Sequence, residues 1–152
     1  MEATNGPVLA ATDLSSDSRK ALVWAARYAD AFRVPLIIIH VVHDPLDDPG
    51  FYRKNENDPM MPMEEIAKSM LDDFVAETIK DHPDCTVLKS AQQLLVKGTP
   101  TRRIIETAEA TGAQLIAMGS IGRSAVQDLF LGSTTKAVIK STTIPVISTR
   151  VG

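Results

Sequence analysis

The chain has 152 residues, of which 44% are hydrophobic and 23% are charged, and its formal net charge at pH 7 is −3. These values are typical of one soluble globular domain over residues 1–152, and the slight negative charge argues against binding to nucleic acid or to an acidic membrane. A single cysteine, Cys85, excludes an intrachain disulfide and favours a cytoplasmic protein. Residues 1–6 lack the features of a signal peptide, and no apolar run approaches the roughly 20 residues that span a bilayer.

Predicted strands and helices alternate along the whole chain. Short apolar runs predict the strands, and apolar residues at three- and four-residue spacing predict the helices between them. The predicted strands are residues 7–12, 34–42, 86–97 with a polar interruption, 113–118 and 144–149; the predicted helices are residues 16–32, 63–80, 99–112 and 133 onward. Five strands separated by four helices predict an α/β fold, a single-domain, doubly wound parallel sheet with helices on both faces.

Two details of the packing follow from the same pattern. Phe32 falls on the apolar face of the first helix, so it is expected to be buried. Cys85 stands at the start of the third predicted strand, beginning with 86–88, and is expected to be a small buried residue rather than a reactive thiol.

Residues 43–62 differ from the rest of the chain. The segment holds four of the nine prolines, and its five acids and two bases give it the same net charge as the whole protein, −3. Such a composition predicts a long surface loop, because loops of this length are uncommon in compact domains unless they are functional or disordered. A lid over a binding site and a floppy insertion remain equally open.

A glycine-rich segment follows the apolar run 113–118. Glycines 119, 122 and 132 form the pattern G-x2-G-x9-G-S, and a predicted helix begins directly after it. Unpaired N–H groups at a helix N-terminus attract phosphate, and glycines allow a ligand to approach the backbone. The spacing differs from GxxxxGK[ST] and from GxGxxG. We therefore expect a phosphate site of another kind; the alternative is a tight turn without a ligand.

The glycine pattern and two strand ends resemble the universal stress protein family over nearly the whole chain. The strand ends are Ala11-Thr12-Asp13 and His40-Val41-Val42. The resemblance implies a five-stranded parallel sheet in the order 3-2-1-4-5, with ATP, or AMP or ADP, in the cleft of the nucleotide-binding members. The cofactor-binding residues that it implies are Ala11, Thr12, Asp13, Val41, Met118, Gly119, Gly122, Arg123, Gly132, Ser133, Thr134 and Thr135.

The resemblance also implies a role for each part of this set. Asp13 would lie near the nucleoside, the Val41 backbone would contact the adenine, and Met118 and Gly119 would line the ribose side. The residues from Gly122 onward would hold the phosphates. A homodimer would form through the fifth strand, at Val146, Ile147 and Thr149. The chain departs from many ATP-binding members at Ala11, where they carry proline.

The residues themselves leave simpler interpretations open. Asp13 can be a cap of the first helix, and Arg123 can be a solvated surface charge. The three histidines are too few and too scattered for a metal site, so Mg²⁺ would be held by the nucleotide phosphates, with help from the hydroxyls of Ser133 and Thr134.

No catalytic residue is predicted. Hydrolysis needs a group that positions water and a means of stabilising charge, and Asp13 and Asp128, the only acids near the motif, stand in no such constellation. We expect a nucleotide-dependent regulator or adaptor rather than an enzyme. The alternatives are a nucleotide hydrolase or transferase on a related scaffold, and a ligand-free module that binds a protein partner through residues 43–62 and 63–80.

Overall fold

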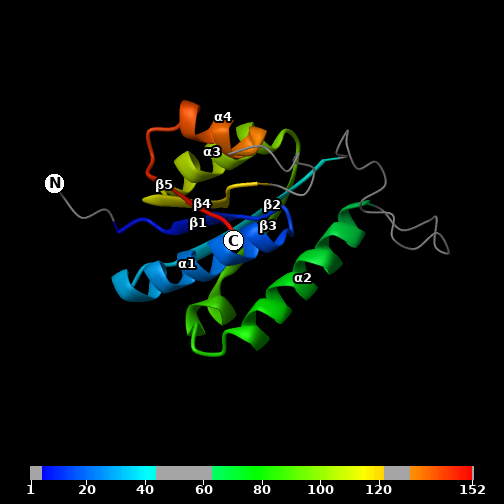
Figure 1. Ribbon diagram of the computed structural model, residues 1–152, viewed down its shortest axis with the longest axis vertical. Coiled ribbons are helices and arrows are strands. Elements are labelled where there is room, and N and C mark those ends of the chain that lie inside the picture. Colours follow the sequence, from blue (N-terminus) through cyan, green and yellow to red (C-terminus); the bar gives the residue numbers. More distant parts are fainter. Residues whose placement is uncertain (1–4, 44–62, 122–130, 152) are drawn as a thin grey trace.

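The computed structural model describes residues 5–43, 63–121 and 131–151, which form one sheet with helices on both faces (Figure 1). The strands are β1 (Val8–Ala11), β2 (Leu36–Val42), β3 (Gln92–Lys97), β4 (Leu115–Gly119) and β5 (Val146–Thr149). The helices are α1 (Ser16–Phe32), α2 (Met63–Asp81), the 3-10 helix η1 (Thr86–Ser90), α3 (Pro100–Thr111) and α4 (Ser133–Ser141). All strands are parallel and lie in the order β3-β2-β1-β4-β5, which confirms the predicted fold class and strand order.

The sheet separates two hydrophobic clusters. Figure 1 shows α1 and α2 on one face of the sheet and α3 and α4 on the other. Successive residues of a strand point to opposite faces, so Leu36 and Ile38 of β2 pack on the α1 side while Ile37 and Ile39 pack on the α3 side. Every residue of β2 is buried, which explains why its sequence is apolar except at His40.

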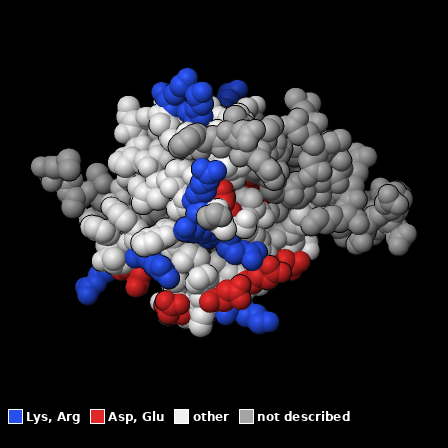
Figure 2. Space-filling view, viewed as in Figure 1, with Lys and Arg blue, Asp and Glu red and all other residues white. Residues whose placement is uncertain are grey.

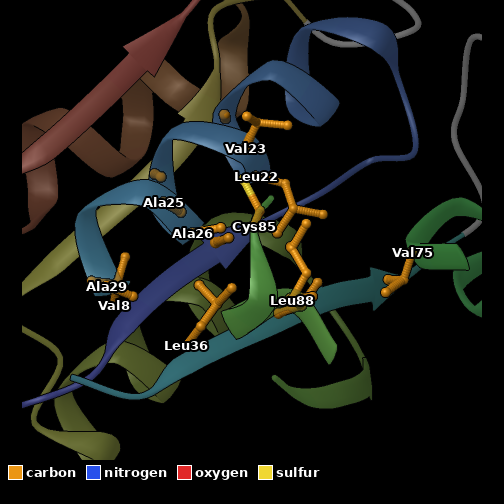
Figure 3. Packing of buried hydrophobic residues seen from close by; sticks show 14 of the residues in the cluster. Val8, Leu22, Val23, Ala25, Ala26, Ala29, Leu36, Val75, Cys85 and Leu88 are labelled. Atoms are coloured by element: carbon orange, nitrogen blue, oxygen red, sulfur yellow. The ribbon is translucent and has the colours of Figure 1, made fainter. Parts of the chain in front are cut away.

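Helix α1 lies close against the sheet because its buried face is built from small residues. Ala21, Ala25 and Ala29 are almost fully buried there, and Figure 3 shows this part of the helix passing over Val8 and Leu36. Ser15 caps the helix by accepting a hydrogen bond from the N–H of Ser18. The first turn of α1 is thereby fixed directly after the end of β1.

The prediction that Phe32 is buried is wrong. Its side chain is 61% exposed and stacks on Tyr28, with 4.4 Å between the ring centroids. The helix ends at Arg33, whose φ of 56° is left-handed, and the N–H of Val34 turns back to bond to the Ala29 carbonyl at 2.9 Å. Val34, rather than Phe32, is the buried residue at this end of the helix, and it belongs to the hydrophobic cluster on the α1 side.

The prediction that residues 86–88 begin the third strand is also wrong, because they belong to η1. Pairing of β3 with β2 starts at Gln92 and Ile37, so the chain before Gln92 has no strand partner in the ladder. The apolar residues there fill space under α1 instead: Leu88 is buried, and Cys85 lies beside Leu22 (Figure 3). The expected burial of Cys85 is confirmed.

Charges of both signs are mixed on the side of the molecule that Figure 2 shows. Lys and Arg side chains lie at the top and across the middle of this view, and most of the Asp and Glu side chains lie toward its lower edge. Arg19 and Glu77 join α1 to α2 through an ion pair of 2.9 Å, and the Arg19 guanidinium lies 4.7 Å from the ring centroid of Phe74. The described part of this face therefore offers no extended surface of one sign, in agreement with the small net charge.

Candidate functional site

The predicted site residues gather at one edge of the sheet. In an open parallel sheet, ligands bind beyond the carboxyl ends of the strands, where the strand order reverses. Here that point lies between β1 and β4, because the chain crosses over to β2 on one face and returns to β4 and β5 by the other. The described candidates at this edge are Ala11, Thr12, Asp13, Val41, Met118, Gly119, Gly132, Ser133, Thr134 and Thr135. Two further candidates, Gly122 and Arg123, lie outside the described residues.

The turn from β1 to α1 is held by its own side chains. The Thr12 hydroxyl accepts a hydrogen bond from the Leu14 N–H at 2.9 Å and lies 2.8 Å from the Ser18 hydroxyl. Asp13 Oδ1 accepts from the Ser15 N–H at 3.0 Å, and Leu14 takes a positive φ of 69°. Asp13 is therefore half-buried in an Asx turn, and the cap of α1 is Ser15 rather than Asp13.

The end of β2 projects beyond the end of β1. The Thr12 N–H donates to the Ile39 carbonyl at 2.9 Å, so Ile39 turns its backbone groups toward β1. The direction of the backbone groups repeats every second residue of a strand, so Val41, like Ile39, turns its N–H and C=O toward β1. Val41 lies beyond Ala11, the last residue of β1. The Val41 side chain is buried in the cluster on the α3 side, which leaves its backbone as the part that can contact a ligand.

His40 of β2 contacts the turn that follows β1. It is buried, with 3% of its surface exposed, and its Nδ1 lies 2.7 Å from the Thr12 carbonyl oxygen. The bond joins β2 to the turn after β1, so the ends of these two neighbouring strands are held together. Sequence reasoning gave His40 only as part of a strand-end motif.

Gly119, at the end of β4, is required by the approach of α1. A Cβ on Gly119 would lie 2.8 Å from the Ser18 nitrogen and 2.9 Å from the Asp17 carbonyl carbon, distances that real Cβ atoms do not show. The Gly119 carbonyl accepts a hydrogen bond from Thr135 Oγ1 at 2.8 Å. The glycine that was expected to line a ribose thus has a structural reason of its own, namely close contact with the first turn of α1.

The start of α4 returns to the same point. The Gly132 N–H donates to the Ser120 carbonyl at 2.6 Å, and Gly132 then caps α4 without a side chain. The first N–H groups of the helix have no partner within it and point outward from its N-terminus. Ser133 is exposed and Thr134 half-exposed there, whereas Thr135 is buried and holds Gly119.

Asp17 is the residue of this edge that sequence reasoning missed. Its carboxylate is buried in the first turn of α1 and accepts from the Val151 N–H at 2.8 Å and from the Ile121 N–H at 3.2 Å. Its carbonyl accepts from the Thr149 hydroxyl at 2.9 Å. In the sequence the only signal was an acid in the first turn of a helix, which is common because the helix dipole favours it.

Two kinds of site find no support in the part of the chain that the structure describes. No group of three or more His, Cys, Asp or Glu side chains there is placed to hold a metal ion. Nor does any described helix combine the length and the apolarity needed to cross a membrane.

The chain is similar to known proteins over nearly its whole length. Residues 4–150 match the model of the Universal stress protein family. The chain belongs to the universal stress protein family. A family member from Thermus aquaticus is 31% identical over 147 residues, which cover 94% of this chain and 97% of that protein.

Solved structures of the family share the fold. A universal stress protein in complex with cAMP superimposes with a TM-score of 0.65, covering 97% of this chain and 98% of that one at 19% identity. A universal stress protein from Archaeoglobus fulgidus in complex with dAMP gives a TM-score of 0.63, with coverage of 95% and 98% and 19% identity.

Proposed function

We propose that this universal stress protein binds an adenine nucleotide at the carboxyl edge of its sheet and acts as a nucleotide-dependent regulator or adaptor in the cytoplasm. The observation that carries the proposal is the meeting of three segments at the reversal point of the strand order: the turn after β1, the backbone of Val41 and the N-terminus of α4. Two solved family members were determined with cAMP and with dAMP, which supports an adenine nucleotide as the ligand.

The adenine would lie beside Val41. The N–H and C=O of Val41 point toward the β1 side, beyond the last residue of that strand, where no residue of the described strands pairs with them. An extended backbone of this kind offers one donor and one acceptor to the edge of a purine. Asp13 follows β1 next to this position and would contact the sugar. The side chain of Ala11 is buried on the α3 side with Val41, so the missing proline changes the wall rather than the polar contacts.

The phosphates would lie at the start of α4. Helix N–H groups and the hydroxyls of Ser133 and Thr134 suit an anion and any Mg²⁺ that it carries. Thr135 would contribute only its N–H, since its hydroxyl donates to the Gly119 carbonyl. Gly122 and Arg123 remain predicted phosphate contacts outside the described residues.

We infer that the nucleotide is sensed rather than hydrolysed. Asp13 follows β1, and Asp17 is bonded to the residues just after β4 and β5; both accept hydrogen bonds from backbone N–H groups, so neither is poised to activate water. A hydrolase remains the alternative. Steady release of ADP or AMP that is abolished by Asp13→Ala would establish it.

A homodimer through β5 is part of the same proposal. β5 is an edge strand of the sheet, and its Pro145 and Thr149 carbonyls bond to β4, so alternate residues such as Val146 and Ser148 turn their backbone groups outward. The Thr149 side chain faces α1 and would not take part. Analytical ultracentrifugation should show a dimer that Val146→Pro weakens, because a proline offers no N–H to the partner strand.

Calorimetry with a variant that introduces a negative charge tests nucleotide binding. ATP and AMP should both bind the wild-type protein, and Ser133→Asp should weaken each by at least about tenfold, because an anion at the helix N-terminus repels phosphate. The variant should still fold, since aspartate is favourable at that position. Ser141→Asp, at the other end of α4, is the matched control and should bind as the wild type does. Failure of the wild type to bind ATP or AMP at millimolar concentration would refute the proposal.

A further inference from the structure

We propose that Asp17 is a positioning residue that sets the affinity of this site for phosphate. The proposal rests on the nucleotide-binding function proposed above and extends it to a residue that would not touch the ligand. Asp17 would act through the backbone at the start of the glycine-rich segment, by fixing the direction in which the chain leaves β4.

The hydrogen bonds of Asp17 join three parts of the fold. The residue belongs to α1, and its two carboxylate oxygens accept from Ile121, just after β4, and from Val151, just after β5. The Thr149 hydroxyl adds a third bond, to the Asp17 carbonyl. One residue therefore links the helix that follows β1 to the ends of the two strands beyond it.

The glycine-rich segment begins and ends beside these bonds. Ile121 is its third residue, and the preceding residue, Ser120, accepts from the Gly132 N–H at its far end. Thr135 in the first turn of α4 donates to Gly119. The bond from Ile121 to Asp17 is thus one and two residues away from the two contacts that place the N-terminus of α4, at Ser120 and Gly119.

Gly119 makes this arrangement possible. With any larger residue at 119, the side chain would collide with the backbone of Asp17 and Ser18, and α1 would have to move away from β4. The carboxylate would then no longer reach Ile121. The lack of a side chain at Gly119 therefore allows α1 to lie close to β4, and this closeness lets the Asp17 carboxylate bond to the Ile121 N–H.

The negative charge of the Asp17 carboxylate would by itself repel a phosphate bound nearby, so its presence calls for a structural reason. Asp17 is 9% exposed, and among the described residues no lysine or arginine forms an ion pair with it. Backbone N–H donors stabilise such a buried charge, and hydrogen bonds to an ionised acceptor are stronger than neutral ones. The charge therefore strengthens the hydrogen bond from Ile121, and this bond fixes the chain where it leaves β4, next to the Ser120 carbonyl that holds Gly132 at the start of α4.

Asp17→Asn tests this role, because one of its two terminal atoms is a donor and cannot accept from an N–H group. ATP and adenosine would be measured by displacement of the same fluorescent ATP analogue, and thermal unfolding would be followed in parallel. We expect the dissociation constant for ATP to rise about tenfold, as for the loss of one hydrogen bond to a charged group. The constant for adenosine should change less than about twofold, since the strand ends that would hold the nucleoside are untouched.

The matched control is Asp30→Asn, which removes the same charge from an exposed position of the same helix and should leave both constants unchanged. Unaltered ATP affinity in Asp17→Asn would overturn the proposal, and so would equal losses for ATP and adenosine, which indicate a general loss of structure. Should Asp17→Asn not fold, Val151→Pro tests the role indirectly: it removes the N–H that holds Oδ1, at an exposed residue, so the carboxylate that binds Ile121 is held less firmly. A rise in the dissociation constant for ATP that is larger than the rise for adenosine is then expected, and no change in either would overturn the proposal. A wild-type protein that binds neither ATP nor AMP would refute the proposed function, and this role with it.

Discussion

The two connections at the carboxyl edge of the sheet are stabilised in different ways. In the turn from β1 to α1, the bonds among Thr12, Leu14, Asp13, Ser15 and Ser18 join residues two to six positions apart. At the start of the connection from β4 to α4, the bonds to Asp17 span 104 to 134 positions. The first connection can form from its own sequence, whereas the second requires the rest of the fold.

The largest effect is expected where the second connection meets α1. Gly119→Val should lower the free energy of unfolding by about 1–3 kcal/mol, because the new side chain must displace the backbone of Asp17 and Ser18. Denaturant unfolding without ligand measures this. Gly112→Ala is the comparison: its φ of 65° disfavours a side chain, but a Cβ there meets no atom within 4 Å, so the loss should be about 1 kcal/mol. A smaller loss at 119 than at 112 would contradict the close approach of α1.

A second variant tests the other end of the same connection. Thr135→Val removes the buried hydroxyl that donates to the Gly119 carbonyl and should cost about 1–2 kcal/mol, because a partly buried acceptor loses its partner. Thr135→Ser keeps the hydroxyl and should retain more of the stability. If valine and serine behaved alike in urea unfolding, the hydrogen bond would have no measurable part in holding α4.

The turn after β1 should respond less. Ser15→Ala removes the cap of α1 and is expected to cost about 1 kcal/mol in thermal or denaturant unfolding. Ser15→Asp keeps an acceptor and should be near neutral. Because the bonds of this turn are local, the loss should not depend on whether Thr149→Val is also present; strong coupling between the two substitutions would show that the connections are not independent.

The smallest effect is expected away from both connections, at the ion pair between Glu64 and Lys97. A backbone hydrogen bond, followed by the Lys97 ammonium, lowers the pKa of the exposed Glu64 carboxyl. A lowered pKa stabilises the fold above the ordinary glutamate pKa of about 4.3, and the contribution is lost as the pH falls through the folded value. The small advantage of the wild type over Glu64→Gln should therefore be present at pH 7 and absent in strong acid, and salt should reduce it. An advantage that grew on acidification would contradict this assignment.

The same contrast explains what the sequence could predict. Features that depend on residues close together in the sequence could be predicted. They include the alternation of strands and helices, the burial of β2 and the polar turn at Thr12 to Ser15, and the structure confirms the sheet that they predict. The end of the first helix was predicted correctly, but periodicity does not tell how the chain turns after it. The left-handed Arg33 brings Val34 into the core and leaves Phe32 exposed. Residues 86–88 were misplaced because an apolar run does not reveal whether a neighbouring strand is long enough to pair with it.

Asp17 could not be recognised for a different reason. Its neighbours in the sequence give it the appearance of an ordinary acid in a first helical turn, and its partners Ile121, Thr149 and Val151 become neighbours only in the folded sheet. A pattern of residue types at fixed spacing describes ligand contacts within one segment. Such a pattern does not show which residue of another helix or strand holds that segment in position.

The bonds from β5 to Asp17 also set an order of events during synthesis. Residues 149 and 151 are made 132 and 134 positions after the helix turn that they hold, so the turn after β1 can form while most of the chain is still unmade. The start of the glycine-rich segment cannot be tied to Asp17 on both sides until the last strand has emerged. A chain still being translated would therefore form the turn after β1 first, and the backbone around the start of α4, where we propose that phosphate binds, would be completed last.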